Sequence, residues 1–304
     1  MCYSGKAYQP GVLTYPEISS VMFMRTAARL LLLCAAVLAT TALPARAQFT
    51  PRTLNDPATG ERFHIEASVG LWMPSTHMDI SSEALGIQGS DIDFKKDLGL
   101  TDHTFRNLAL VLRPARKHKL RYQYIPITFE QESVPTRDVI FQGIRYKVGI
   151  PVNTQLYWKA HRFTYEYDVV ARDWGFAGLL IDAKYTDVLA ALQSPIDYEF
   201  IHAKAPVPTI GGIGRYYVVP NISITGELSG FRLTDIKVPG KPQKVSGHYG
   251  ELDIYGTLNF TDRLGVQGGF RDLNLGYRLT KNEIPTDTGS FILKGIYINA
   301  VARF

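Results

Sequence analysis

The sequence predicts an all-β fold: an antiparallel transmembrane β-barrel of about ten strands, with short periplasmic turns and long extracellular loops. Three observations favour this fold. Long segments alternate apolar and polar residues, the connections between them alternate between short and long, and the chain ends on an aromatic residue within such a segment. Because successive strand side chains point to opposite faces, a barrel wall can be apolar toward lipid and polar inside.

The last segment, 295–304, shows this alternation most clearly. One face carries Ile296, Ile298, Ala300, Ala302 and Phe304, and the other carries Tyr297, Asn299, Val301 and Arg303. A final strand of this kind that ends in Phe resembles the C-terminal insertion signal of bacterial outer-membrane barrels. We interpret Tyr297 and Phe304 as a signal for the barrel assembly machinery.

Residues 1–47 are predicted to be a signal peptide. Arg25 and Arg29 precede an apolar run at 30–43, and a small-x-small cleavage site follows at 45–47. The run is shorter than the roughly 20 residues of a transmembrane helix. Residues 1–21 do not resemble a leader, so the true start is predicted at Met22 or Met24. Residues 48–60 are expected to form a periplasmic segment, and residues 61–304 the barrel.

Composition limits the function classes. Without residues 1–47, the formal net charge falls from +5 to about +2, so the basic character does not indicate nucleic-acid binding. Cys2 and Cys34 both precede the predicted cleavage site, which leaves the mature chain without a thiol. No cofactor-binding motif is present, and we expect no cofactor.

The barrel strands follow from the alternating segments. They are predicted at about 61–73, 104–113, 119–130, 155–170, 174–185, 207–219, 222–233, 251–260, 264–279 and 290–304. A bulge is expected at Pro126, and a helical turn at 188–192. Segment 138–152 fits either an extracellular hairpin or two further barrel strands. We favour the hairpin because it keeps the strand number even.

The connections support this division. Short connections fall at 114–117, 171–173, 220–221 and 261–263, and long ones at 75–101, 131–154, 186–203, 235–247 and 280–289. Outer-membrane barrels have short periplasmic turns and longer extracellular loops. The pattern therefore predicts that both chain ends lie on the periplasmic side.

Two short motifs carry a family resemblance. The run I-D-F-K-K-D-L-G-L at 92–100 precedes a strand, a turn and the run H-K-L-R-Y at 118–122. This arrangement resembles a family of uncharacterised Gram-negative outer-membrane β-barrel proteins. The second motif matches in part, because Arg116 and Lys117 stand before His118. The resemblance implies a barrel in the outer membrane and brings no catalytic residues with it.

The inward faces are predicted to carry a lumen charge network. Its members are Glu66, Arg106, Arg121, Arg162, Glu166, Asp168, Asp182, Arg215, Glu227, Glu251, Asp253 and Arg303. Both signs are expected to pair, because an isolated buried ion costs several kcal/mol. About ten strands leave little lumen. We therefore expect a largely plugged barrel with a structural or loop-mediated binding role, and a narrow channel for a small solute or ion as the alternative.

Enzymatic activity is not expected. A lipid A-modifying enzyme is a further alternative, with Ser246, His248 and Glu251 as candidates, but Glu251 falls on the opposite strand face from the other two. The histidines at 77, 103, 161 and 202 match no metal-ligand spacing. The expected partners are outer-membrane lipid, lipopolysaccharide and the barrel assembly machinery, with no nucleic acid. The sequence leaves the oligomeric state open.

Overall fold

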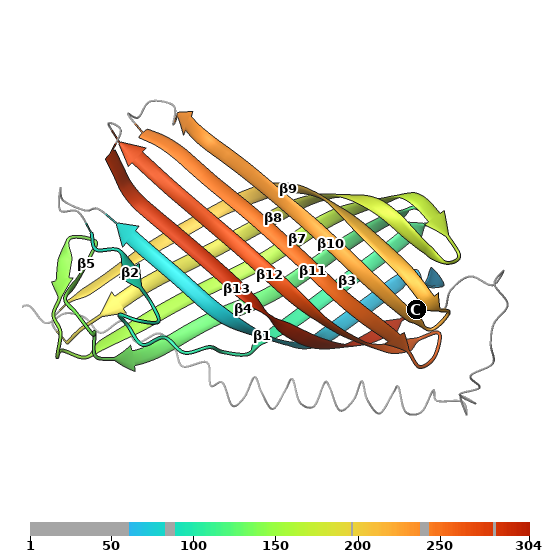
Figure 1. Cartoon of the computed structure of the whole chain (residues 1–304), viewed down its shortest axis with the longest axis horizontal. Coiled ribbons are helices and arrows are strands. Elements are labelled where there is room, and N and C mark those ends of the chain that lie inside the picture. Colours follow the sequence, from blue (N-terminus) through green and yellow to red (C-terminus); the bar gives the residue numbers. More distant parts are fainter. Residues whose placement is uncertain (1–60, 83–88, 196, 238–242, 282–283) are drawn as a thin grey trace, which may run out of the picture. The chain divides into compact units, whose positions relative to one another are not determined.

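The structure is a computed structural model that describes residues 61–82, 89–195, 197–237, 243–281 and 284–304. Within these residues, ten strands form a closed antiparallel ring (Figure 1). They are β1 (Ile65–Ser82), β3 (Phe105–Ala115), β4 (His118–Ser133), β7 (Val152–Arg172), β8 (Gly175–Gln193), β9 (Tyr198–Val219), β10 (Ile222–Lys237), β11 (Gln243–Asn259), β12 (Leu264–Lys281) and β13 (Ile284–Arg303). The predicted fold class is confirmed. The predicted signal peptide and periplasmic segment lie outside the described residues.

The ring closes where its last strand pairs with its first. The β1–β13 register runs from Glu66↔Arg303 to Ser82↔Asp287. At the end of the ring that carries the short turns, which we call the lower end, the backbone N–H groups of His64 and Ile65 both donate to the carbonyl oxygen of Phe304. Every ring strand therefore has two hydrogen-bonded neighbours. The β3–β4 register stops at Tyr124, so the part of β4 beyond Tyr124 pairs with β7 alone among the described residues.

The outer surface carries an apolar belt. Its exposed side chains include Val69, Leu71, Phe163, Leu179, Ile181, Ile210, Ile224, Leu228, Ile254, Ile296 and Ile298. About ten residues along the strands from the short turns or the C-terminus, outward charged residues such as Arg106, Arg232 and Lys294 end the belt. Ten tilted strand residues match the apolar band of about 25 Å of outer-membrane barrels. No helix of the described residues is long and apolar enough to span a membrane.

Several strands continue past the belt where loops are predicted. Strand β8 continues to Gln193 and β9 begins at Tyr198, so the expected loop at 186–203 and its helical turn are wrong. Likewise, β11 and β12 extend into the predicted loops at 235–247 and 280–289. Their outward side chains there no longer follow the apolar pattern, but the backbones remain paired across the ring. The long connections between ring strands are 83–104 and 134–151.

The connection 134–151 forms the predicted hairpin. Strands β5 (Val139–Phe141) and β6 (Ile144–Tyr146) make a separate two-stranded sheet. In Figure 1, β5 and the short β2 (Ile92–Asp93) lie at the end of the ring away from the C-terminus. The bulge expected at Pro126 is absent, because Pro126 pairs with Lys159 in an unbroken register. The β3–β4 register begins at Leu108↔Tyr124, so the missing N–H of Pro126 interrupts no pairing there.

Candidate functional site

The lower interior of the ring, on the side of the short turns, is an ion-pair lattice with equal numbers of both charges. The cations are Arg113, Lys119, Arg121, Arg162, Lys184, Arg215, Arg271 and Arg303; the anions are Glu61, Glu66, Glu166, Asp168, Asp182, Glu227, Glu251 and Asp253. Because inward polar residues alternate with outward apolar residues along the strands, nearly every ring strand contributes a charged side chain to the interior. Buried ions are tolerated only when paired, and each of these ions has a partner of the opposite sign within the lattice.

The lattice is continuous across the ring. Arg121 bridges Glu166 at 3.1 Å and Glu227 at 2.9 Å. Arg162 also contacts Glu227 and binds Asp182 at 3.0 Å. Chains of alternating charges therefore tie strands on different sides of the ring together. Beside the closing strands, a cavity of about 50 Å³ remains, which is room for a few water molecules.

Eleven of the twelve residues assigned to the lumen by sequence lie inside the ring, and one does not. Arg106 is exposed on the outer face, because it shares strand parity with Leu108 and Leu110. Sequence reasoning missed five members of the lattice: Glu61, Arg113, Lys119, Lys184 and Arg271. For the last four, strand parity contained the signal, since each directly precedes or follows an outward apolar residue. Glu61 precedes β1, so strand parity does not apply to it.

The upper interior is filled instead by an apolar plug. The ring contributes Trp72, Phe105, Ile127, Phe129, Leu156, Trp158, Phe291 and Leu293; the connections contribute Ile92, Phe94, Leu98, Leu100, Val139, Phe141 and Tyr146. Phe105 and Phe129 meet edge to face with ring centroids 5.2 Å apart. At the upper end of the ring, the buried side chains of the two long connections therefore pack with those of the ring strands.

An ion pair and several hydrogen bonds join the two long connections. Arg137 Nε donates to Asp97 Oδ1 at 2.8 Å, and Arg137 Nη2 donates to Asp97 Oδ2 at 2.7 Å. These hydrogen bonds lower the pKa of Asp97 below its usual value. Asp97 begins the D-L-G-L motif, whose two leucines are buried in the plug and whose Gly99 has a φ of 64°. The motif therefore stabilises the packing of connections 83–104 and 134–151 at the upper end of the ring, which together we call the cap.

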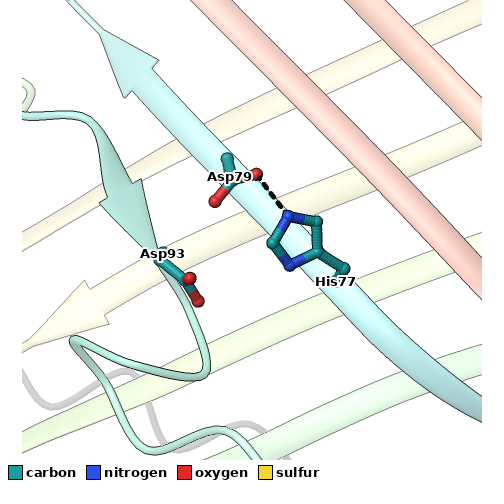
Figure 2. Close-up of side chains that lie close together, drawn as sticks. All are labelled: His77, Asp79 and Asp93. Carbon is teal, nitrogen blue, oxygen red and sulfur yellow. Dashed lines mark ion pairs between the residues drawn. The ribbon is translucent and has the colours of Figure 1, made fainter.

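The candidate for chemistry is a cluster of three side chains on the outer face above the belt (Figure 2). His77 and Asp79 share one face of β1, and Asp93 of β2 pairs with Asp79 across the ladder. His77 Nε2 lies 3.1 Å from Asp79 Oδ2, and one ligand atom of each residue lies within 4.8 Å of the others. Sequence spacing missed this cluster because Asp93 follows Asp79 by 14 positions along the chain.

The surroundings of the cluster define its chemistry. Burial raises the pKa of Asp79, and the carboxylates of Asp93 and Asp91 raise it further against the effect of His77. Lys96 Nζ lies 3.1 Å from Asp93 Oδ2, so the protein itself supplies a cation there. The His77 side chain is 52% exposed. An imidazole oriented by a carboxylate can act as a general base.

The lipid A-modifying candidates do not form a catalytic constellation. Ser246 Oγ donates to Asp235 Oδ1 at 2.9 Å, and His248 Nε2 lies 3.1 Å from Asn274 Oδ1. Glu251 is buried in the lattice and binds Lys184 at 2.6 Å. The side chains of Ser246, His248 and Glu251 therefore contact three different residues and do not contact one another in a catalytic arrangement.

The two residues of the expected assembly signal occupy different environments. Tyr297 is buried inside the ring, and its hydroxyl donates to Asp253 Oδ1 at 2.8 Å. Phe304 points outward and is 61% exposed. Tyr297 is thus part of the lattice, and Phe304 is the free apolar end of the belt.

Comparison with solved structures supports the fold. The outer membrane protease OmpT from Escherichia coli matches with a TM-score of 0.51 and 9% identity, over 85% of this chain and 100% of that chain. The Pseudomonas putida toluene transporter TodX (9% identity, 82% of this chain and 92% of that chain) and a Pseudomonas aeruginosa FadL homologue (8%, 82% and 93%) match with TM-scores of 0.33 and 0.34, too low for any inference. No family model matches, and no curated protein matches by sequence.

The comparison corrects one prediction and confirms another. The prediction that the chain is not an enzyme is contradicted, because this fold carries proteolytic activity in a solved protein. At 9% identity the similarity shows the fold alone, so it transfers no catalytic residue. The chain has the fold of a Gram-negative outer-membrane β-barrel, and the predicted outer-membrane location is confirmed at that level.

Proposed function

We propose that this protein is a sealed outer-membrane barrel that acts through its extracellular surface, in a structural or loop-mediated binding role. The observation that carries the proposal is the double filling of the interior. The apolar plug closes the upper end, and the charge-balanced lattice closes the lower one. We further propose membership of the uncharacterised Gram-negative barrel family that the 92–100 motif resembles.

The two fillings argue against the channel alternative for different reasons. An ion would need several water-sized spaces in sequence, but the cavity within the lattice has about 50 Å³. A small apolar solute would have to displace Trp72, Phe94 or Phe129, which are all at most 2% exposed. Removal of one large buried side chain typically costs 3–5 kcal/mol. Thermal fluctuation would rarely open such a path.

Planar-bilayer conductance tests the proposal. Protein purified from outer membranes should show a heat-dependent mobility shift, which verifies folding, and no conductance steps. A variant in which residues 138–147 are replaced by a short Gly-Ser linker should also be silent, because it leaves the lattice in place. Reproducible conductance steps from folded wild-type protein would refute the sealed barrel.

Hydrolysis at the His77 cluster is the second candidate function. The specific observations are the 3.1 Å His77–Asp79 contact and the fold shared with an outer membrane protease. In this candidate function, His77 removes a proton from water while Asp79 orients the ring, and Asp93 lies within reach of the same space.

Peptide cleavage by the purified barrel tests this candidate. General-base loss typically costs 10²–10⁴-fold in rate, so His77→Ala should lower cleavage at least a hundredfold. His248→Ala is the matched control, because His248 is also exposed on the upper outer face but has Asn274 as its partner. Equal activity of both variants, or no cleavage by wild-type protein, would exclude catalysis at His77.

A further inference from the structure

A second, larger cavity lies at the end of the ring where the short turns are. It has a volume of about 510 Å³. Residues 61–64, the β3–β4 turn and the β7–β8 turn contribute its lining. This volume is in the usual range of small-molecule sites, which is about 300–1,000 Å³. The cavity lies at the end of the ring that carries the short turns, which is the predicted periplasmic side.

The lining of the cavity is strongly cationic. It contains four arginines, Arg62, Arg113, Arg116 and Arg172, against two acids, Glu61 and Asp173. Glu61 is already engaged, because Arg113 Nη1 lies 2.9 Å from its Oε2. The other acid pairs weakly, with Arg116 Nη2 3.7 Å from Asp173 Oδ1. Arg62 and Arg172 have exposed side chains, and no ion pair is recorded for either among the described residues.

The base of the cavity is formed in part by buried aromatic side chains. Phe63 and Phe176 are both buried and line it. Phe176 lies under Lys119, whose Nζ is 3.5 Å from the ring centroid, and Arg113 lies 5.7 Å from the centroid of Phe63. Arg113 Nε is a buried N–H without a hydrogen-bond partner in the described structure. A buried aromatic floor with exposed arginines at its rim is suited to a ligand that combines an apolar part with an anionic group.

We propose that this cavity binds a small anionic ligand from the periplasm, whose carboxylate or phosphate group is held by Arg62, Arg116 and Arg172. Guanidinium groups match the planar, two-oxygen geometry of both anions. The lattice cannot serve this purpose because its cations are all paired with buried acids, whereas the cavity carries an excess of two positive charges. The site is separate from the extracellular surface of the proposed function.

Isothermal titration calorimetry tests the proposal on protein purified from outer membranes into maltoside micelles. The probes are inorganic pyrophosphate and citrate, which separate phosphate from carboxylate recognition. We expect saturable binding of at least one probe. Arg116→Gln combined with Arg172→Gln should weaken that binding at least tenfold, and both side chains are exposed, so folding should persist.

The matched control is Arg263→Gln, an exposed arginine in another short turn that does not line the cavity. It should bind within twofold of wild type. Binding of pyrophosphate alone would assign a phosphate ligand, and binding of citrate alone a carboxylate ligand. No saturable heat with either probe, or an equal loss in Arg263→Gln, would overturn the proposal.

Discussion

Breaking the buried ion pair at the closing strands should destabilise the whole ring. Arg303 Nε donates to Glu66 Oε2 at 2.6 Å, and these residues lie directly opposite each other in the β1–β13 register. Their side chains are 1% and 8% exposed. Arg303→Met removes the cation and keeps much of the volume, so Glu66 would lose the one hydrogen-bond donor that its side chain has among the described residues.

The magnitude follows from the burial and the distance. At 2.6 Å and an effective dielectric constant near 20, the gross attraction is about 6 kcal/mol. Removal of one partner of such a buried pair usually costs 3–5 kcal/mol, because the remaining ion is uncompensated. We therefore expect Arg303→Met to lower the free energy of unfolding by about 4 kcal/mol. Glu66→Gln should cost a similar amount, since it leaves Arg303 with Asn259 as a neutral partner.

Urea unfolding of the refolded barrel in micelles, followed by the gel-mobility shift, measures both costs. The double variant should be more stable than the sum of the single costs predicts, because neither charge is then left alone. The matched control is Lys294→Met, whose pair with Asp272 is exposed and should contribute less than about 1 kcal/mol. Single-variant costs below that control would refute the reasoning.

Three further predictions concern the ring, its end and its cap. A Cβ at Gly70 would meet the backbone oxygen of Ile298 at 1.9 Å, so Gly70→Ala should cost about 1–3 kcal/mol in urea unfolding, whereas Gly226→Ala, with open space, should be near neutral. Phe304→Ala should leave in vitro stability unchanged, because that side chain is exposed, but should lower the protein level in outer membranes several-fold if assembly reads it. Because Arg137 lowers the pKa of Asp97, the cap should keep its hydrogen-exchange protection at pH 5–7 and lose it as pH falls below about 4; loss already at pH 5 would contradict this.

Sequence alone could predict the ring because its signal is local. Whether a side chain faces lipid or lumen depends on strand parity, so Ile298 and Arg303 could be assigned to opposite faces from the last ten residues. The error at Arg106 came from treating every charge near a strand as inward. Its parity is that of Leu108, and it is exposed just above the belt, where a charge meets the aqueous interface rather than lipid.

Strand parity does not predict which charged residues pair with each other or where a strand ends, because both depend on contacts between residues far apart in the sequence. The pairing of Arg121 with both Glu166 and Glu227 depends on three strands, and His77 meets Asp93 only because a two-residue strand returns to β1. Above the belt, β8 and β9 still pair at Val188↔Ala203, although their outward residues lose the lipid-facing pattern. Backbone hydrogen bonds maintain such extensions without any apolar signature.

The interior changes from ionic to apolar along the ring, and this order has a physical cause. Inside the membrane belt the outer face is already apolar, so inward polar residues give the strands the alternation that membrane barrels show. Above the belt water surrounds the ring, and the apolar side chains move inward to Trp72, Phe129 and their neighbours. The membrane part is thus polar inside, and the projecting part is built like a soluble β-protein. An open path would require the loss of both the apolar plug and the ion-pair lattice. Deletion of the hairpin disturbs only the plug, so it is expected to leave the barrel sealed.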